Sequence, residues 1–249
     1  MANIDRQDFG DRVSVAVIGT GYWGKNLLRN FDELGVLAAT CDVDPARVAW
    51  SKEAYADTLA VTDVADIAEN PNIAAVAIAT PAATHGTLAR VFLEAGKHVF
   101  VEKPLCLDPK EGLALSALAE ERGLTLMVGH LLLYHPAFRA LSGVVKSGRI
   151  GQLRYVYSNR ASLGVIRTEE NALWSFAPHD VSMILALAEQ LPESVAAKGA
   201  HFITEGVADI TLSHLSFANG LQAHIFVSWL HPYKDHRVVV IGSDAMIVF

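Results

Sequence analysis

The stretch Val13–Gly24, VSVAVIGTGYWG, is a short apolar run that ends in three glycines. We interpret the run as a buried strand and the segment after it, roughly Trp23–Leu34, as a helix. Gly19, Gly21 and Gly24 form the pattern G-x-G-x-x-G at the junction. The first glycine permits a tight turn, the second lets a pyrophosphate approach the backbone, and the third lets the helix pack closely on the strand. Amides at the helix N-terminus favour a bound anion.

A second apolar run, Val36–Cys41, ends at Asp42, about 20 residues beyond the glycines, where a carboxylate accepts hydrogen bonds from an adenosine ribose. Together the two features predict a dinucleotide site. Because a carboxylate repels a 2′-phosphate and no basic residue follows Asp42 directly, we expect NAD rather than NADP. Arg47, one helical turn further on, leaves NADP as the less favoured alternative.

The same residues also suggest a phosphate-binding P-loop, because Gly19–Lys25 spells G-x-x-x-x-G-K. A P-loop requires Ser or Thr next, to hold magnesium with its hydroxyl. Asn26 stands there instead, and this interpretation gives Asp42 no role. We therefore reject it.

Composition limits the remaining classes. A chain of 249 residues with 51% hydrophobic and 19% charged residues indicates a globular protein of one large or two ordinary domains. The net charge of −7 argues against nucleic acid or an anionic membrane as partner. Cys41 and Cys106 are too few for a disulfide framework, the first ten residues do not resemble a signal peptide, and no apolar run is long enough for a membrane helix. We expect a cytoplasmic protein. The histidines form no H-E-x-x-H zinc motif, so no metal is expected.

The first half of the chain alternates strands with helices. Further strands are predicted at 58–61, 73–79, 98–102 and 124–128, and helices at 46–56, 64–69, 83–95 and 109–122. Such alternation implies a doubly wound parallel sheet, which we assign to residues 1–130.

The second half has a different pattern. Strands are predicted at 152–162, 193–203, 207–217, 221–229 and 237–241, and helices at 136–146 and 179–189. Asn219-Gly220 is a strong hairpin signal between two of the strands. We expect an α+β domain with a largely antiparallel sheet over residues 131–249. The chain ends at Met246–Phe249 in what looks like the opening of another strand, which indicates an incomplete domain.

Four motifs now resemble one known family, that of glucose–fructose oxidoreductase, inositol dehydrogenase and the rhizopine-catabolism oxidoreductases. They are GTGYWG at Gly19–Gly24, ATP at Ala79–Pro81 with His85, EKPL at Glu102–Leu105, and PHD at Pro178–Asp180. The resemblance implies an N-terminal Rossmann domain, a second domain with an open-faced sheet, and homodimers or homotetramers that associate through that face. The cofactor contacts it implies are Gly19, Thr20, Gly21, Tyr22, Trp23, Gly24, Asp42, Arg47, Thr80, Pro81, His85, Glu102 and Lys103.

Lys103 follows a predicted strand, so it is placed at the carboxyl edge of the sheet, where ligands bind in open α/β folds. Desolvation or a neighbouring cation lowers the pKa of a lysine and lets it accept a proton near neutral pH. The alternative is a surface ion pair with Glu102. The resemblance implies that Lys103 is catalytic and that the Lys103–Pro104 bond is cis.

His179 stands at the start of the predicted helix 179–189 and could simply pack against the core. The resemblance implies instead that it lies beside the lysine and binds the substrate hydroxyl or relays its proton, a task that suits imidazole. The family often has Asp four residues earlier, where this chain has Ser175. Because Ser holds no negative charge, a Lys–Asp–His relay is doubtful and Lys103 with His179 would have to suffice.

Two stretches, Leu163–Asp180 and Gly129–Pro136, look like members that act on nucleotide-linked amino sugars or their uronic acids. The guanidinium groups of Arg160 and Arg167 could pair with a sugar carboxylate or diphosphate. Asn171 and Trp174 could line the sugar site. The alternatives are ordinary ion pairs for the arginines and core packing for Trp174.

The expected function is that of an NAD-dependent oxidoreductase. It would move hydride from a secondary alcohol of a sugar derivative, at C3 of a UDP-linked N-acetylhexosamine or hexuronate. A polyol, inositol or free-sugar dehydrogenase is the alternative within the family. A non-catalytic nucleotide-binding regulatory subunit is the alternative from another class.

Overall fold

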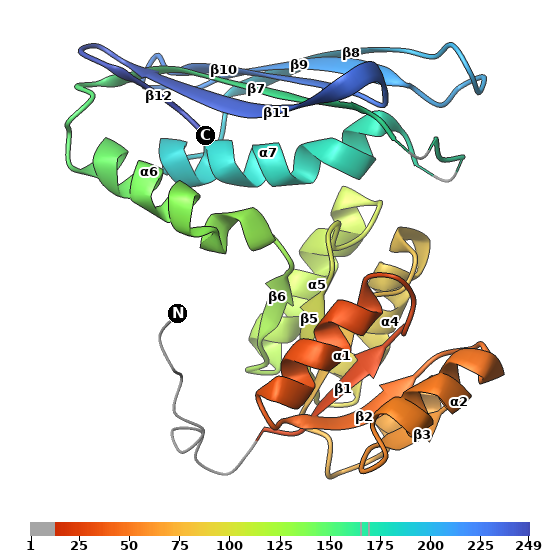
Figure 1. Cartoon of the computed structure of the whole chain (residues 1–249). Helices are drawn as coiled ribbons and strands as arrows, with labels where there is room; N and C mark the ends of the chain where they lie inside the picture. Colours follow the sequence, from red (N-terminus) through yellow and green to blue (C-terminus); the bar gives the residue numbers. More distant parts are fainter. Residues whose placement is uncertain (1–12, 165, 169) are drawn as a thin grey trace. The chain divides into compact units, whose positions relative to one another are not determined.

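The computed structural model describes residues 13–164, 166–168 and 170–249, and the chain divides after Gly129 into two compact units. Each unit has its own sheet and its own core (Figure 1). The first ten residues, on which the prediction about a signal peptide depends, lie outside the described part. Over the described ranges, no helix is both long and apolar enough to span a lipid bilayer.

The first unit is a parallel six-stranded sheet in the order β3-β2-β1-β4-β5-β6. Its strands are β1 (Val15–Ile18), β2 (Leu37–Cys41), β3 (Leu59–Val61), β4 (Ala75–Ile78), β5 (His98–Val101) and β6 (Leu126–Val128). Its helices are α1 (Gly24–Glu33), α2 (Pro45–Ala54), α3 (Val64–Ala68), α4 (Ala82–Glu94) and α5 (Pro109–Glu121). This arrangement confirms the predicted doubly wound parallel sheet.

Local sequence signals explain where these elements begin. All four residues of β1 are buried, as expected for a strand covered on both faces. Asp44 and Asp108 cap α2 and α5, each accepting a hydrogen bond from the backbone two residues on, with proline at the first helical position. The helices pack apolar side chains such as Leu28 and Phe92 against the sheet.

The strand order positions the candidate site. The chain leaves β1 toward β2 and β3 and then crosses to the other side of β1 for β4, β5 and β6. In open α/β sheets a ligand binds at the carboxyl ends of the strands beside such a reversal. Three of the predicted segments lie at these ends: the turn Gly19–Gly24 follows β1, Thr80 follows β4, and Glu102–Lys103 follows β5.

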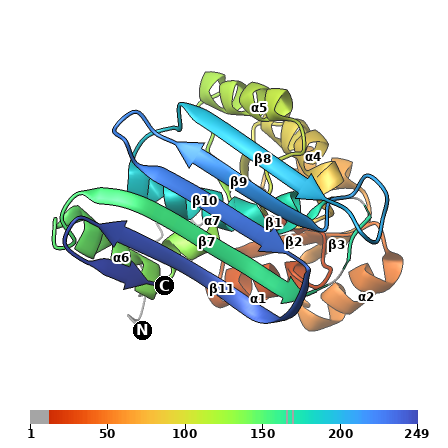
Figure 2. The same cartoon turned by 90° about the horizontal axis from the view of Figure 1, so that it is seen from above.

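The second unit contains a six-stranded sheet in the order β12-β11-β7-β10-β9-β8. Its strands are β7 (Leu153–Leu163), β8 (Ser194–Ala200), β9 (Ile210–Ser216), β10 (Gln222–Ser228), β11 (Leu230–Gly242) and β12 (Met246–Val248). Its helices are the 3₁₀ turn η1 (Leu131–Tyr134), α6 (Pro136–Lys146) and α7 (Ala172–Ala188). Among the described strands of this sheet, only β7 and β10 pair in parallel, so the predicted largely antiparallel sheet is confirmed. Figure 1 shows α6 and α7 on one face of this sheet, and Figure 2 shows its strands from the other face.

The structure corrects two of the predicted boundaries in this unit and adds one short turn. The helix predicted at 179–189 begins at Ala172, because the side chain of Asn171 accepts a hydrogen bond from the backbone of Trp174 and caps it. The helix continues through Pro178, which cannot donate a backbone hydrogen bond. Strand β11 begins at Leu230, seven residues earlier than predicted, and pairs with β7 across an irregular register. The turn η1 was not predicted.

Candidate functional site

Two of the three glycines in the turn after β1 are required by the packing of the chain itself. Gly19 has a φ of +89°, and a Cβ there would lie 2.8 Å from Cγ2 of Thr80. A Cβ at Gly24 would overlap the carbonyl oxygen of Gly19. These two positions therefore fix the tight turn and the close approach of α1, as the motif predicts.

Gly21 is different. Its φ is not positive, and among the described residues a Cβ built there would meet only the Arg47 guanidinium, with Nη1 at 3.5 Å. The fold therefore does not itself demand glycine at this position. Its bare backbone is open to a ligand, which fits the predicted approach of a pyrophosphate. Of the two residues that follow, Tyr22 is 91% exposed and Trp23 is 41% exposed.

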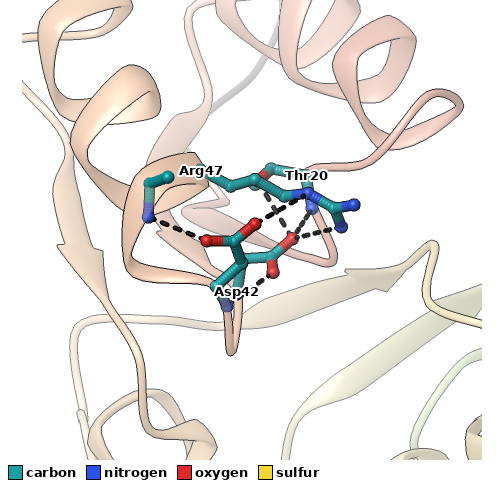
Figure 3. Close-up of polar contacts among 5 residues, drawn as sticks. Thr20, Asp42 and Arg47 are labelled. Carbon is teal, nitrogen blue, oxygen red and sulfur yellow. Dashed lines mark hydrogen bonds and ion pairs between the residues drawn. The ribbon is translucent and has the colours of Figure 1, made fainter.

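Asp42 is the centre of a polar cluster at the end of β2. Figure 3 shows its carboxylate between Thr20 and the Arg47 guanidinium. Oδ2 accepts hydrogen bonds from the backbone N–H of Thr20 at 2.7 Å and its hydroxyl at 3.1 Å, and Oδ1 accepts from the N–H of Asp44 at 3.0 Å. Burial by itself would raise the pKa of Asp42. The N–H groups of Asp44 and Thr20, the hydroxyl and the cation of Arg47 outweigh it, so that the pKa lies below its usual range.

Arg47 lies half-exposed over this cluster. Its Nη1 is 3.4 Å from Oδ2 of Asp42, and its Nε is 3.6 Å from Oδ2 of Asp44. The same guanidinium is the neighbour of Gly21 described above. The structure thus brings together Thr20, Gly21, Asp42 and Arg47, four residues predicted to contact the cofactor from separate parts of the sequence.

Glu102 connects the glycine turn to the end of β5. Trp23 donates a hydrogen bond from Nε1 to Oε1 of Glu102 at 2.5 Å. Burial raises the pKa of Glu102, and the contacts with Trp23, Lys103 and His85 offset this only in part. Lys103 itself is partly buried, and the Lys103–Pro104 bond is cis, as predicted. The residue before Lys103 is therefore held directly by the glycine turn.

His85, in the first turn of α4, lies beneath this edge and is 2% exposed. Its Nδ1 is 2.6 Å from the carbonyl oxygen of Pro104, and its Nε2 is 2.8 Å from that of Thr80. Pro81 is exposed and precedes α4. The described polar contacts of the His85 ring are thus with the backbone, and its predicted contact with the cofactor stays a prediction.

His179 lies within α7, in the second unit, one turn after the buried Ser175. Residues four apart share one face of a helix, so Ser175 and His179 lie on the same face of α7. Ser175 is the position at which the family often has Asp. The carbonyl of His179 accepts a hydrogen bond from the Ser182 hydroxyl at 2.8 Å. Because Lys103 belongs to the first unit, joint action of the two residues stays a prediction.

Arg160 forms an ion pair with Asp180, the residue after His179. Its Nε lies 2.7 Å from Oδ2 and its Nη2 3.0 Å from Oδ1, a bidentate pair, and Ser158 also donates to Oδ1. Asp180 is fully buried, and the Arg160 side chain is 11% exposed. The alternative interpretation of Arg160, an ordinary ion pair, therefore describes its observed geometry, and a substrate contact stays a prediction.

The other predicted substrate residues also have contacts within the chain. Arg167 is half-exposed and forms an ion pair with Glu170 at 3.2 Å. Asn171 caps α7, and Trp174 is partly buried in its first turn. Residues 165 and 169 of this stretch lie outside the described part of the chain.

His130 is a candidate that was not predicted as a site residue. It directly follows Gly129 at the end of β6, and a Cβ at Gly129 would lie 3.0 Å from Oε2 of Glu102. Nδ1 of His130 is buried without a hydrogen-bond partner among the described residues, and burial lowers the pKa of the ring. The available signal was a histidine placed directly after a strand of a parallel sheet. Over the same described residues, no cluster of His, Cys, Asp or Glu is arranged to hold a metal ion.

Comparison with known proteins agrees with this geometry. Residues 13–130 match the family model described as "Oxidoreductase family, NAD-binding Rossmann fold", and residues 138–248 match the "GFO/IDH/MocA C-terminal domain". The chain is 30% identical over 229 residues to UDP-N-acetylglucosamine 3-dehydrogenase of Acidithiobacillus ferrooxidans, covering 92% of this chain and 71% of that one. It is 29% identical to scyllo-inositol 2-dehydrogenase (NAD(+)) of Bacillus subtilis, covering 95% and 73%.

Solved structures give the same result. The crystal structure of GenD2 from gentamicin A biosynthesis, in complex with NAD, has a TM-score of 0.88 at 25% identity and covers 96% of this chain and 72% of that one. GnnA, the UDP-N-acetylglucosamine 3-dehydrogenase of Acidithiobacillus ferrooxidans, has a TM-score of 0.84 at 27% identity, with 94% and 75% covered. With both of its units matched, the chain belongs to the GFO/IDH/MocA oxidoreductase family and is an NAD(P)-dependent dehydrogenase acting on CH–OH groups.

Proposed function

We propose that the chain oxidises a secondary alcohol of a nucleotide-linked sugar with NAD, and that Lys103 accepts the hydroxyl proton. The supporting observation is the position of Lys103 at the end of β5. It shares the carboxyl edge of the sheet with the glycine turn and Thr80, and Trp23 ties that turn to the neighbouring Glu102. In a parallel sheet this edge is where a dinucleotide and its substrate bind.

Each residue has a defined task in this proposal. NAD, when bound, supplies the carbon that accepts the hydride. The open backbone at Gly21 faces the pyrophosphate, and the ionised Asp42 accepts hydrogen bonds from the adenosine ribose. Lys103, as the neutral amine, takes the hydroxyl proton while hydride leaves the carbon, and it returns that proton in the reverse direction. His179 holds the substrate hydroxyl or relays the proton, a role that rests on the sequence motif.

The first prediction concerns Gly21→Ala. The added Cβ meets only the end of the flexible Arg47 side chain, so the free energy of unfolding should stay within about 0.5 kcal/mol of the wild-type value. The dissociation constant for NAD should nevertheless rise by about tenfold or more, because the methyl group obstructs the pyrophosphate and a loss of 1.4 kcal/mol is tenfold. Calorimetric titration with NAD and urea unfolding measure the two quantities.

Gly143→Ala is the matched control. Gly143 lies in α6 of the second unit, a Cβ there has nothing within 4 Å among the described residues, and its φ is not positive. This variant should keep the wild-type dissociation constant for NAD. If Gly21→Ala also binds NAD normally, the proposed position of the pyrophosphate is wrong.

The substrate class is supported by the relative that is 30% identical, whose name specifies UDP-N-acetylglucosamine and position 3. The relative at 29% identity is named for scyllo-inositol and supports the alternative within the family. We therefore propose oxidation at C3 of a UDP-linked N-acetylhexosamine or its uronate, with NAD preferred over NADP because of the Asp42 carboxylate.

A screen of UDP-N-acetylglucosamine, its uronate, myo-inositol and glucose, each with NAD and with NADP, tests this proposal through the absorbance of the reduced cofactor. We expect the highest kcat/KM for a UDP-sugar with NAD. A far better rate with myo-inositol or glucose would contradict the substrate class. Binding of NAD without reduction by any of these compounds would favour a regulatory subunit.

A further inference from the structure

We infer that His85 is a positioning residue whose ring carries a proton on both nitrogens and bridges the carbonyls of Thr80 and Pro104. The bridge fixes the turn that presents Lys103. The consequence for turnover rests on the proposed role of Lys103. The protonation of the ring does not rest on that role, because it is inferred from the contacts of the ring.

The geometry of the two contacts carries the inference. Nδ1 lies 2.6 Å from the oxygen of Pro104 and Nε2 lies 2.8 Å from the oxygen of Thr80. A backbone carbonyl only accepts hydrogen bonds, and neutral imidazole has a single N–H to donate. The neutral ring would therefore leave one pair of acceptor atoms facing each other at hydrogen-bond distance. The imidazolium donates to both oxygens.

Because His85 is buried, the difference between its neutral and its doubly protonated form affects both contacts. The His85 side chain is 2% exposed, so water cannot take over either contact. A buried cation needs compensating negative charge nearby. Glu102 supplies it, since its charge interaction with His85 favours the ionised form of this carboxylate. The cation of Lys103 is the opposing neighbour, one residue before Pro104.

The two carbonyls belong to the ends of adjacent strands. Thr80 follows β4, and Pro104 follows Lys103 beyond β5. Lys103 is thus held on both sides: Trp23 binds the preceding Glu102, and His85 binds the following Pro104. Such a clamp suits a base whose amine must meet the substrate hydroxyl accurately, because a displacement of about 1 Å can cost about 10²-fold in rate.

Nitrogen-detected NMR of the histidine rings tests the protonation directly. The His85 signals are identified by their loss in His85→Gln. We expect both ring nitrogens of His85 to carry protons in the folded wild-type protein at pH 7.5. His98 is the internal control, because its Nδ1 accepts a hydrogen bond from Thr125 and must lack a proton. An unprotonated nitrogen on His85 at this pH would overturn the inference.

Kinetics with NAD and UDP-N-acetylglucosamine test the positioning. The single side-chain nitrogen of His85→Gln replaces two ring nitrogens, so it cannot meet both carbonyls as the ring does. It should lower kcat by about 10- to 100-fold while the dissociation constant for NAD changes less than twofold. His98→Gln should match the wild-type protein in both. An unchanged kcat in folded His85→Gln would overturn the positioning role. If the wild-type protein shows no turnover, the proposed function fails, and the NMR result still decides the state of the ring.

Discussion

Lys103→Met is expected to lower kcat by about 10²- to 10⁴-fold, the range that a positioned general base contributes. Methionine keeps the unbranched shape of lysine and is one heavy atom shorter, but it cannot accept a proton. The glycine turn and the Asp42 cluster do not depend on the Lys103 amine, so the dissociation constant for NAD should stay within about twofold. Initial rates of NADH formation and calorimetric titration with NAD measure the two quantities.

Two further variants make this test specific. Lys103→Arg keeps the positive charge but cannot be deprotonated, so it should be as inactive as Lys103→Met if the lysine acts as a base. Lys52→Met, at an exposed position in the last turn of α2, should have wild-type rates. Full activity in Lys103→Met would contradict the proposed mechanism. Activity retained only in Lys103→Arg would indicate that the charge matters rather than the base.

The first unit was predictable because its signals are local. The glycine triplet, the Asp44-Pro45 and Asp108-Pro109 caps and the fully apolar strands each determine structure over a few residues, and they agree with one another. In the second unit, Asn219-Gly220 predicted the connection from β9 to β10. The parallel pairing of β10 with β7 was not predicted, because α7, β8 and β9 separate the two strands along the chain.

The start of α7 was predicted wrongly from local sequence patterns. The helix was predicted to begin at His179, but it begins at Ala172 after the Asn171 cap and runs through Pro178, with Ala172 and Ala177 buried. Local sequence patterns were limited in the same way as a guide to the site. Sequence patterns identified Asp42 and Lys103, because strand ends and motif spacing place them. They could not show that His85 binds two carbonyls, since that depends on which elements meet in space.

The buried pair of Arg160 and Asp180 gives the largest expected effect on stability. Arg160→Met removes the guanidinium and leaves the fully buried Asp180 carboxylate with the Ser158 hydroxyl as its remaining described partner. Breaking one side of a buried ion pair costs about 3–5 kcal/mol of the free energy of unfolding. Urea unfolding followed by tryptophan fluorescence, which includes the signal of Trp229 in the core of the same unit, measures this loss.

Two comparisons separate this structural role from a substrate contact. Arg237→Met removes the half-exposed partner of Asp235 and should cost less than about 1 kcal/mol, because exposed ion pairs contribute little. Arg160→Met with Asp180→Leu removes both buried charges and should recover part of the lost stability, since an apolar pair has no charge left unpaired. If Arg160 acted mainly on the substrate, Arg160→Met would instead unfold like the wild-type protein and show only a raised KM for the UDP-sugar.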